Sequence, residues 1–504
     1  MPAQTMTSDR AAPAVGSDGH QRRRWWILGV LGIAQLMVVL DATVVNIALP
    51  SAQKALHFSN DNRQWIITAY ALAFGSLLLI GGRIGDLFGR KRTFIAGAIG
   101  FAVASAFGGA AQSFDVLVAA RALQGGFAAL LAPAALSLLT TTFTDPGERG
   151  KAFAVWGAIG GGAGALGLLL GGVLTQSLSW RFTMFVNLGF AIPAALGAFA
   201  LLQPKSDAVK PRIDLPGTLT ATGGLFALVY GLAQAQTHGW GSSTTVGFLA
   251  GGLLLLAAFV AIQARSEHPL LPLSIVRERN RGGSFLALGV LGAGMFGVFL
   301  FLTYYLQQSL GYSPLKTGLA FLPLTGALVI TAGVASTRVL PRTGPRPLFA
   351  AGMALAAVGL ALLAQLGVHA SYATQVLPGL TLVGAGLGLV FPPATNIATS
   401  GVNAADAGVA SALVNTAPQV GGSIGTALLS TLAASATSSY LAGTQASAHV
   451  VSRAAVHGYT TAFWWSAGIF AAGALITGLL VRGQLREPTP APRAQPEAQA
   501  LGAI

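Results

Sequence analysis

The sequence predicts an all-α membrane protein that crosses the bilayer many times, and three observations lead to this fold class. Of its 504 residues, 53% are hydrophobic and only 9% are charged, whereas soluble proteins carry about 25% charged residues. The apolar residues come in runs of about 20, the length of a helix that spans a bilayer. The chain also contains 66 glycines, and small residues let membrane helices pack closely.

Fourteen apolar runs predict fourteen spanning helices. We place them at residues 25–49, 63–82, 93–112, 115–140, 151–174, 181–202, 216–236, 246–264, 283–308, 316–338, 347–367, 374–397, 408–433 and 460–481. The run at 216–236 and the one at 246–264 have few landmarks besides hydrophobicity. These two runs lie between a first set of six predicted helices and a second set of six.

We expect five segments on this basis. Residues 1–21 and 485–504 are polar or rich in Ala and Pro and are expected to be disordered tails. Residues 22–205 form an N-terminal six-helix bundle, residues 206–281 hold two inserted helices and a linker, and residues 282–484 form a C-terminal six-helix bundle.

The basic residues predict the orientation. With the N-terminus inside, most of the 29 Lys and Arg residues fall in cytoplasmic segments. The outer side holds only Lys54, Arg63, Arg181, Lys316 and Arg453. By the positive-inside rule, both termini are cytoplasmic. The Ala- and Gly-rich composition points to a bacterial source, so we expect a multi-pass protein of the bacterial plasma membrane.

Several classes of function are excluded or disfavoured. With no cysteine in the chain, disulfides, thiolate metal sites and a cysteine nucleophile are excluded. The net charge of +14 reflects membrane orientation, so we expect no nucleic-acid partner. No phosphate-binding Gly-x-x-x-x-Gly-Lys-Ser/Thr loop occurs, and no histidines pair as a metal site. We therefore expect no enzyme activity, no cofactor besides the proton and no metal.

Two charges fall deep within the spans, Asp41 in the first helix and Arg121 in the fourth. A charge inside lipid is costly and is functional by default. Counted at about 1.5 Å per residue from the outer ends at Pro50 and Asp115, both charges reach a similar level in the outer half. We expect an ion pair whose carboxylate exchanges protons. The alternative is a pair that only locks two helices together.

The stretch Gly82-Arg-Ile-Gly-Asp-Leu-Phe-Gly-Arg-Lys-Arg92 lies between the second and third spans. Its charges and glycines predict a short cytoplasmic hairpin with a sharp turn, and residues 338–346 read as a worn copy of it. The stretch resembles the loop signature of the major facilitator superfamily, Gly-x-Leu-x-Asp-Arg-x-Gly-Arg-Lys/Arg-Arg. Ile84 replaces the leucine, and Leu87 replaces the arginine after the aspartate.

Further motifs resemble the fourteen-helix drug:proton antiporters of that superfamily. The first is Leu40-Asp-Ala-Thr-Val-Val-Asn-Ile-Ala-Leu-Pro50 and the second is Arg121-Ala-Leu-Gln-Gly-Gly126. The glycines of the fifth span resemble the antiporter motif, with Leu168 in place of its proline; they are Gly160, Gly164, Gly167, Gly171 and Gly172. Plain close packing explains these glycines equally well. The resemblance covers residues 22–482 and implies the six-plus-two-plus-six plan, with proton coupling at Asp41 and Arg121.

The resemblance also implies a cytoplasmic latch that breaks as the bundles rock, because Gly147-Glu-Arg-Gly-Lys151 matches a family element. The latch comprises Gly82, Asp86, Gly89, Arg90, Glu148 and Arg149.

Polar or aromatic residues that could line a substrate cavity are Asn46, Gln124, Tyr304, Tyr305, Gln307, Asn396, Asn415 and Gln419. Such residues more often join helices than bind ligands.

The sequence therefore predicts a proton-coupled antiporter that exports amphipathic drugs or antibiotics, cationic ones among them, by alternating access. Its partners are a small-molecule substrate, protons and the lipid bilayer, and we expect it to act as a monomer. A dedicated exporter of one metabolite or self-made antibiotic is the alternative. A proton symporter for uptake is disfavoured by the first- and fifth-helix motifs, and a membrane sensor by the lack of a sizeable soluble domain.

Overall fold

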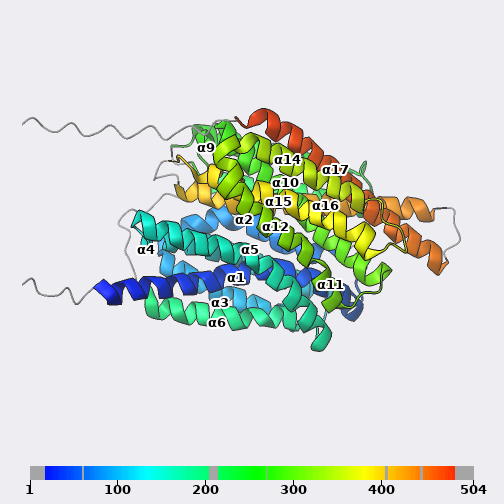
Figure 1. Ribbon diagram of the computed structural model, residues 1–504, viewed down its shortest axis with the longest axis horizontal. Helices are drawn as coiled ribbons and strands as arrows, with labels where there is room; N and C mark the ends of the chain where they lie inside the picture. Colours follow the sequence, from blue (N-terminus) through cyan, green and yellow to red (C-terminus); the bar gives the residue numbers. More distant parts are fainter. Residues whose placement is uncertain are drawn as a thin grey trace, which may run out of the picture.

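Long helices that run roughly side by side make up the molecule (Figure 1). The computed structural model describes residues 17–59, 62–203, 214–267, 269–402, 407–442 and 447–482, and within these ranges it contains no β-strand. The first helix begins and the last helix ends at the same end of the molecule (Figure 1). We call this end the termini side and the opposite end the far side.

The N-terminal bundle has six helices. They are α1 (Ser17–Leu56), α2 (Gln64–Phe88), α3 (Arg90–Gly109), α4 (Phe114–Thr142), α5 (Pro146–Ser177) and α6 (Phe182–Leu201). Helix α4 packs against α2 and α3, and α1 packs against α5 and α6. Aromatic side chains such as Tyr70, Phe94 and Phe101 fill the core between them. Proline begins α5, where its missing N–H has no intrahelical partner to lose.

The C-terminal bundle also has six long helical segments, several of them interrupted by a π-helical turn. They are α10 (Arg279–Tyr304) with η1 (Tyr305–Ser309); α11 (Pro314–Ala320), α12 (Leu322–Val334), η2 (Ala335–Val339) and α13 (Leu340–Thr343); α14 (Pro345–Leu363); η3 (Tyr372–Val376) with α15 (Leu377–Thr399); α16 (Ala407–Leu441); and α17 (Ala448–Leu480). A short helix, α9 (Leu273–Arg277), precedes them. Helix α14 packs against α15 and α17, and α10 packs against α16.

Two inserted helices, α7 (Leu215–His238) and α8 (Ser243–Arg265), form a hairpin between the bundles in the chain. The Asp214 carboxylate caps α7 by accepting a hydrogen bond from a backbone N–H of its first turn. Thr222 of α7 donates to the Ser76 carbonyl of α2 (3.2 Å), and Thr431 of α16 donates to the Leu232 carbonyl of α7 (2.9 Å). Helix α7 is thus bonded to one helix of each bundle.

Each of the fourteen predicted spans falls on a helix or on consecutive helical segments. Among the described residues, twelve helices are long and apolar enough to cross a membrane. Helices α2 and α5 contribute shorter apolar stretches, Gln64–Leu78 and Leu166–Ser177. The count of fourteen spans therefore stays a prediction.

Several helices extend beyond their apolar runs. Helix α1 begins at Ser17, inside the range predicted as tail, and continues past Pro50 to Leu56. The prediction that Pro50 ends this helix is wrong. Helix α17 begins at Ala448, well before the predicted residue 460. Backbone hydrogen bonding does not stop where the hydrocarbon stops, so hydropathy underestimates helix length. Residues 1–16 and the tail predicted at 485–504 lie outside the described residues.

The stretch Gly82–Arg92 is mostly helical, contrary to the predicted hairpin loop. Helix α2 continues to Phe88 and α3 begins at Arg90, so Gly89 alone joins them. Its φ of 90° and ψ of 132° are accessible to glycine and strained for other residues. Gly344 makes the corresponding link between α13 and α14 with a φ of 71°. These equivalent links agree with the faint repeat seen in the sequence.

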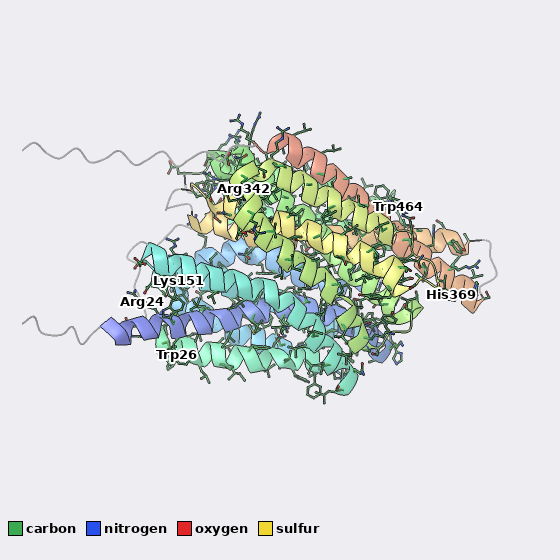
Figure 2. All side chains as sticks on the ribbon, viewed as in Figure 1. Arg24, Trp26, Lys151, Arg342, His369 and Trp464 are labelled. Carbon is green, nitrogen blue, oxygen red and sulfur yellow. The ribbon has the colours of Figure 1, made fainter. Side chains whose placement is uncertain are left out.

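Basic side chains mark the termini side. Figure 2 places Arg24, Lys151 and Arg342 toward this side, whereas His369 lies at the far side.

Candidate functional site

Asp41 and Arg121, the two charges expected to meet, form an ion pair in the core of the N-terminal bundle. Arg121 Nη1 of α4 donates to Asp41 Oδ2 of α1 at 2.5 Å. The Asp41 side chain is 0% exposed and the Arg121 side chain 2%. In such surroundings little solvent screens the interaction between the two charges.

Two amides hold the second oxygen of the carboxylate. Asn187 Nδ2 of α6 donates to Asp41 Oδ1 at 2.7 Å, and Gln124 Nε2 donates to the same oxygen at 3.1 Å. Gln124 also donates to Ser105 Oγ of α3 at 2.7 Å and accepts from Arg121 Nη1 at 2.9 Å. Asn187, Gln124 and Ser105 are all fully buried. Four helices therefore supply the network around one carboxylate.

The guanidinium of Arg121 has further contacts with α2. Its Nε donates to the Ile66 carbonyl at 3.1 Å, and its central carbon lies 4.4 Å from the ring centroid of Tyr70. Arg121 and Gln124 are three residues apart and share a face of α4, which brings both to Asp41. Backbone, ring and carboxylate together fix the position of the cation.

A buried ion pair of this kind is sensitive to the loss of either charge. Removing one charge of a buried pair leaves the other uncompensated, which costs about 3–5 kcal/mol in soluble proteins. Protonation of Asp41 removes such a charge, so Arg121 must then find another partner or move. Three donors face the carboxylate, from Arg121, Gln124 and Asn187.

The glycine face of α5 lies directly on the turn of α1 that carries Asp41. A methyl group at Gly167 would collide with the Thr43 hydroxyl, and one at Gly171 would lie 2.7 Å from the Val44 carbonyl oxygen. Only glycine lets the two backbones approach this closely. Helix α5 is one continuous helix here, as expected where Leu168 replaces the proline that would kink it. It therefore buttresses the Asp41 turn.

The same helix also contacts the opposite bundle. A Cβ on Gly172 would lie 2.8 Å from Leu315 Cα of α11, and a Cβ on Gly318 would lie 2.6 Å from the Leu168 carbonyl oxygen. Gly164, by contrast, faces open space. Gly160 lies in α5, and its surroundings are outside the description. Adjacent turns of α5 thus touch Asp41's helix and the C-terminal bundle.

Two of the predicted cavity residues join the bundles at the far side. The Tyr304 hydroxyl donates to Gln53 Oε1 of α1 at 2.6 Å. Gln307 Nε2 donates to the Ile47 carbonyl of α1 at 3.0 Å. Tyr304 is fully buried. In this conformation both residues close the molecule at the far side.

The remaining cavity candidates are scattered. Tyr305 donates to a backbone carbonyl of its own bundle at 2.7 Å, and Asn46 donates to a carbonyl one turn earlier in α1 at 2.9 Å. Gln419 lies against α2, where a Cβ on Gly75 would be 3.3 Å from Gln419 Cβ. Asn396 is exposed at the end of α15, and Asn415 is half-buried in α16. Gln124 belongs to the Asp41 network rather than to these residues.

The latch residues lie at the termini side, with a pairing that was not expected. Glu148 Oε2 accepts from Arg24 Nη1 of α1 at 3.2 Å. Arg149 is exposed on the first turn of α5, and Arg90 is half-buried at the start of α3. The side chain of Asp86 lies outside the described residues. The latch glycines are Gly82 within α2 and Gly89 after it.

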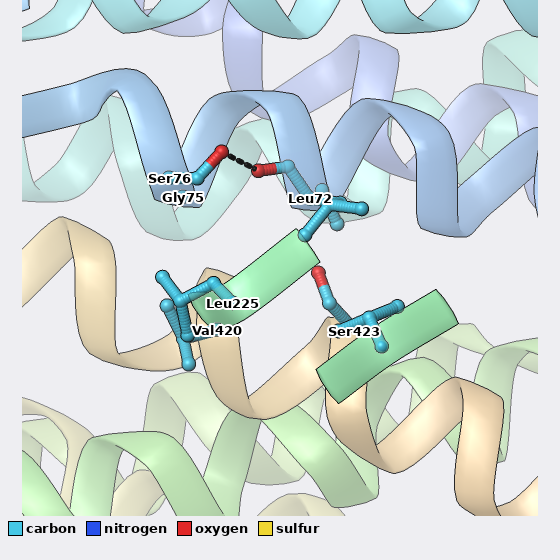
Figure 3. A pocket seen from close by; sticks show the side chains of 8 residues that line it. Leu72, Gly75, Ser76, Leu225, Val420 and Ser423 are labelled. Atoms are coloured by element: carbon cyan, nitrogen blue, oxygen red, sulfur yellow. Dashed lines mark hydrogen bonds between the residues drawn. The ribbon is translucent and has the colours of Figure 1, made fainter. Parts of the chain in front are cut away.

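A crevice runs along the seam between α2, α7 and α16 (Figure 3). Its walls include Leu72, Gly75, Ser76, Leu225, Val420 and Ser423. The Ser76 hydroxyl donates to the Leu72 carbonyl of its own helix at 2.6 Å. The crevice is too narrow to hold a water molecule, so it marks the packing of the inserted helix rather than a drug site.

The family model described as Major Facilitator Superfamily matches residues 31–426. This match covers most of the chain, from the first helix through the Asp41 network and on into α16 of the C-terminal bundle. The chain belongs to the major facilitator superfamily. It is therefore a member of a family of membrane transporters.

Three curated relatives of this transporter are named for antibiotics. A puromycin resistance protein of Streptomyces alboniger is 50% identical over 92% of each chain. A cephamycin export protein of Amycolatopsis lactamdurans is 40% identical over 86% of this chain and 90% of that protein. A tetracenomycin C resistance and export protein of Streptomyces glaucescens is 36% identical over 83% of this chain and 78% of that protein.

Solved transporters share the fold at low sequence identity. A peptide transporter in complex with sulfate has a TM-score of 0.65 and is 17% identical, covering 94% of this chain and 98% of that chain. A bacterial homologue of the lysosomal transporter Spinster, in an inward-facing and unoccupied conformation, has a TM-score of 0.62 at 16% identity, over 92% and 98% of the two chains. These similarities establish the architecture alone.

Sequence reasoning missed three members of this transporter's network: Asn187, Ser105 and Tyr70. None of the sequence motifs described above assigns a role to Asn187. A signal was nevertheless present, since Asn187 is an amide within the otherwise strongly apolar helix α6. Polar groups inside a span need partners, so Asn187 was a candidate partner for Asp41.

Proposed function

We propose that this transporter exports amphipathic drugs or antibiotics in exchange for protons, by alternating access. The observation that carries the proposal is the Asp41 carboxylate, fully buried and bonded by Arg121, Gln124 and Asn187. A buried acid in a membrane helix that is paired with a fixed cation suits proton exchange. The names of the relatives support export of antibiotics as the direction and the substrate class.

The orientation we propose has the termini side in the cytoplasm of a bacterial cell. The distribution of basic residues supports it, with Arg24, Lys151 and Arg342 toward that side (Figure 2). Cytoplasmic loops carry an excess of Lys and Arg. The far side then faces outward, and the site lies in the plasma membrane. A monomer contains the whole Asp41 network, since all its residues come from one chain.

A proton gradient supplies sufficient free energy for this exchange. One elementary charge that crosses 100 mV yields about 2.3 kcal/mol. At about 1.4 kcal/mol per factor of ten, this corresponds to a roughly 50-fold substrate gradient. Asp41 takes up a proton when the transporter is open outward and releases it to the cytoplasm, where substrate binds. The charge of Arg121 stays constant, so the pair senses the proton through Asp41 alone.

The inter-bundle contacts support a conformation closed to the outside. Tyr304 bonds Gln53 and Gln307 bonds α1 at the far side. The backbone N–H of Leu315 donates to Gln176 Oε1 of α5 in the same region, at 3.3 Å. Export requires these contacts to part in each cycle. The cytoplasmic latch, including Glu148, then closes the other side.

A second candidate is a dedicated exporter of one antibiotic or metabolite. It shares the fold and the proton site and differs only in substrate range. The relatives favour it specifically, because each is named for a single compound. Uptake by proton symport would reverse the direction while keeping the same buried pair.

Inverted membrane vesicles with an acid interior test this function. We would add puromycin, a cephamycin, tetracenomycin C or a cationic dye and record recovery of a quenched pH-sensitive dye. The native protein is expected to release protons with at least one compound, and Asp41→Asn with none. Asp115→Asn, which changes an exposed acid at the start of α4, is the matched control. Equal recovery in Asp41→Asn and native protein would remove proton exchange from Asp41. Recovery with one compound only would select the dedicated exporter.

A further inference from the structure

Arg63 lies among three aromatic rings of the opposite bundle. It is the residue directly before α2 in the N-terminal bundle and is only 8% exposed. Its guanidinium carbon lies 4.2 Å from the ring centroid of Tyr304, 5.5 Å from that of Tyr459 and 6.0 Å from that of Phe301. A cation within about 6 Å of a ring centroid is attracted by the negative face of the ring. Three rings around one cation form a cage.

The rings replace a carboxylate as the partner of this cation. Within the described part of the chain, no Asp or Glu forms an ion pair with Arg63. Arg121, the other buried arginine, has Asp41 instead. Among the described residues, the cage thus stabilises the positive charge of Arg63 by aromatic faces and by no carboxylate.

The cage belongs to the C-terminal bundle and holds together without Arg63. The Tyr459 hydroxyl of α17 donates to Gln308 Oε1 of η1 at 3.3 Å. Phe301 packs against Tyr459 with ring centroids 6.3 Å apart and against Phe463 at 6.4 Å. Separation of the bundles therefore withdraws Arg63 and leaves the rings in place.

We propose that Phe301, Tyr304 and Tyr459 form a cation-binding site that Arg63 fills while the far side is closed. Once the bundles part at this side, the site takes an organic cation such as a quaternary ammonium. Arg63 then competes with that cation, and closure of the far side expels it. This inference rests on the alternating access of the proposed function. It does not require that the exchanged ion be a proton.

The chain allows a direct measurement, because it has no native cysteine. Spin labels at Leu178→Cys and Ala373→Cys, exposed far-side positions of the two bundles, report the opening of that side. The purified protein in lipid nanodiscs is measured without a proton gradient. Benzyltrimethylammonium is the probe cation. The ratio of open to closed far-side distances is read as a function of its concentration.

Arg63→Gln is expected to raise the open-to-closed ratio by about 2- to 30-fold, the range of one to several cation–π contacts. It is also expected to lower the probe concentration needed for half-maximal opening. Tyr304→Leu is expected to weaken the response to the probe, whereas Tyr304→Phe keeps it, since the ring remains. Lys316→Gln is the matched control. Lys316 lies 3.8 Å from the Tyr312 ring centroid within the same bundle, so its loss is expected to leave the distances unchanged.

Two results would overturn the proposal. One is an unchanged distance ratio in Arg63→Gln. The other is the same probe response in Tyr304→Leu as in native protein. These readouts separate the cage from proton exchange. If Asp41→Asn retains dye recovery in vesicles while Arg63→Gln opens the far side, the cage stands and the proton site falls.

Discussion

Asn187 and Gln124 donate to the same carboxylate oxygen of Asp41, from α6 and α4 respectively. Arg121 alone bonds the other oxygen. The two oxygens are therefore not equivalent. A proton on Oδ1 displaces two amide donors, whereas a proton on Oδ2 displaces one charged donor. The amides fix the orientation of the carboxylate, so that Oδ2 faces Arg121.

Replacing Asn187 by alanine tests this orienting role. The change removes one of two donors to Oδ1 from a fully buried site, and leaving a buried polar group less satisfied costs about 1–3 kcal/mol. We expect a lower midpoint of thermal unfolding in detergent and slower drug-dependent proton release in vesicles. Gln365→Ala is the control, because Gln365 is exposed and bonds only its own helix at 3.1 Å. Equal midpoints for Asn187→Ala and Gln365→Ala would contradict the assignment.

The glycine face of α5 makes a second prediction. Gly167→Ala places a methyl group against Thr43 and 2.9 Å from the Leu40 carbonyl oxygen, next to Asp41. Overpacking of this kind costs about 1–3 kcal/mol. We expect a lower unfolding midpoint and reduced transport. Gly164→Ala on the same helix meets open space and is expected to behave like native protein. The assignment fails if both variants lose the same amount of stability.

The link between α2 and α3 predicts the effect of changing its glycine. At Gly89, the φ of 90° and ψ of 132° suit no residue with a Cβ, and strain of this kind costs about 1–3 kcal/mol. Gly89→Ala is expected to destabilise the protein in a thermal-shift assay. Gly85→Ala, in the last turns of α2, places its methyl 4.0 Å from Thr93 and is expected to be tolerated. A Gly89→Ala variant that is as stable as native protein would contradict this prediction, because it would show that the backbone between α2 and α3 can adopt another conformation.

The ion pair of Arg24 and Glu148 is expected to contribute little to stability. Its side chains are 41% and 20% exposed, and exposed pairs are worth about 0–1 kcal/mol. A double-mutant cycle with Arg24→Gln and Glu148→Gln, read by thermal unfolding at low and high salt, measures the coupling. We expect less than about 1 kcal/mol, falling with added salt. A salt-independent coupling above this value would identify a true lock at the termini side.

Charges in apolar runs were the most informative feature of the sequence. Asp41 and Arg121 stood out because a charge in hydrocarbon is costly. Their similar estimated depths in the membrane predicted that the two side chains meet. Gln124 was noticed too, yet it was assigned to the cavity. Whether the Gln124 side chain points to Asp41 depends on how α4 is rotated about its axis relative to α1. The spacing of apolar residues cannot specify this rotation in helices that are apolar on every face.

Contacts between bundles were beyond sequence reasoning. The sequence identifies Arg63 only as one of a few basic residues on the outer side, and Tyr304 only as a possible cavity residue. It does not show that the two side chains meet, because they belong to different bundles. Helix ends were misjudged at Pro50 and near residue 460 for a different reason. Hydropathy reports lipid contact, whereas helices continue into water as long as their backbone hydrogen bonds are made.

The hydrogen bonds of α7 to both bundles limit how the bundles can move relative to each other. A helix that is bonded to both α2 and α16 can keep both bonds during rocking only if the bundles rotate about an axis close to that helix and do not slide apart there. The crevice beside it is correspondingly tight. In the proposed transport cycle, the inserted pair would then guide the direction of rocking, while the far side and the termini side move in opposite directions.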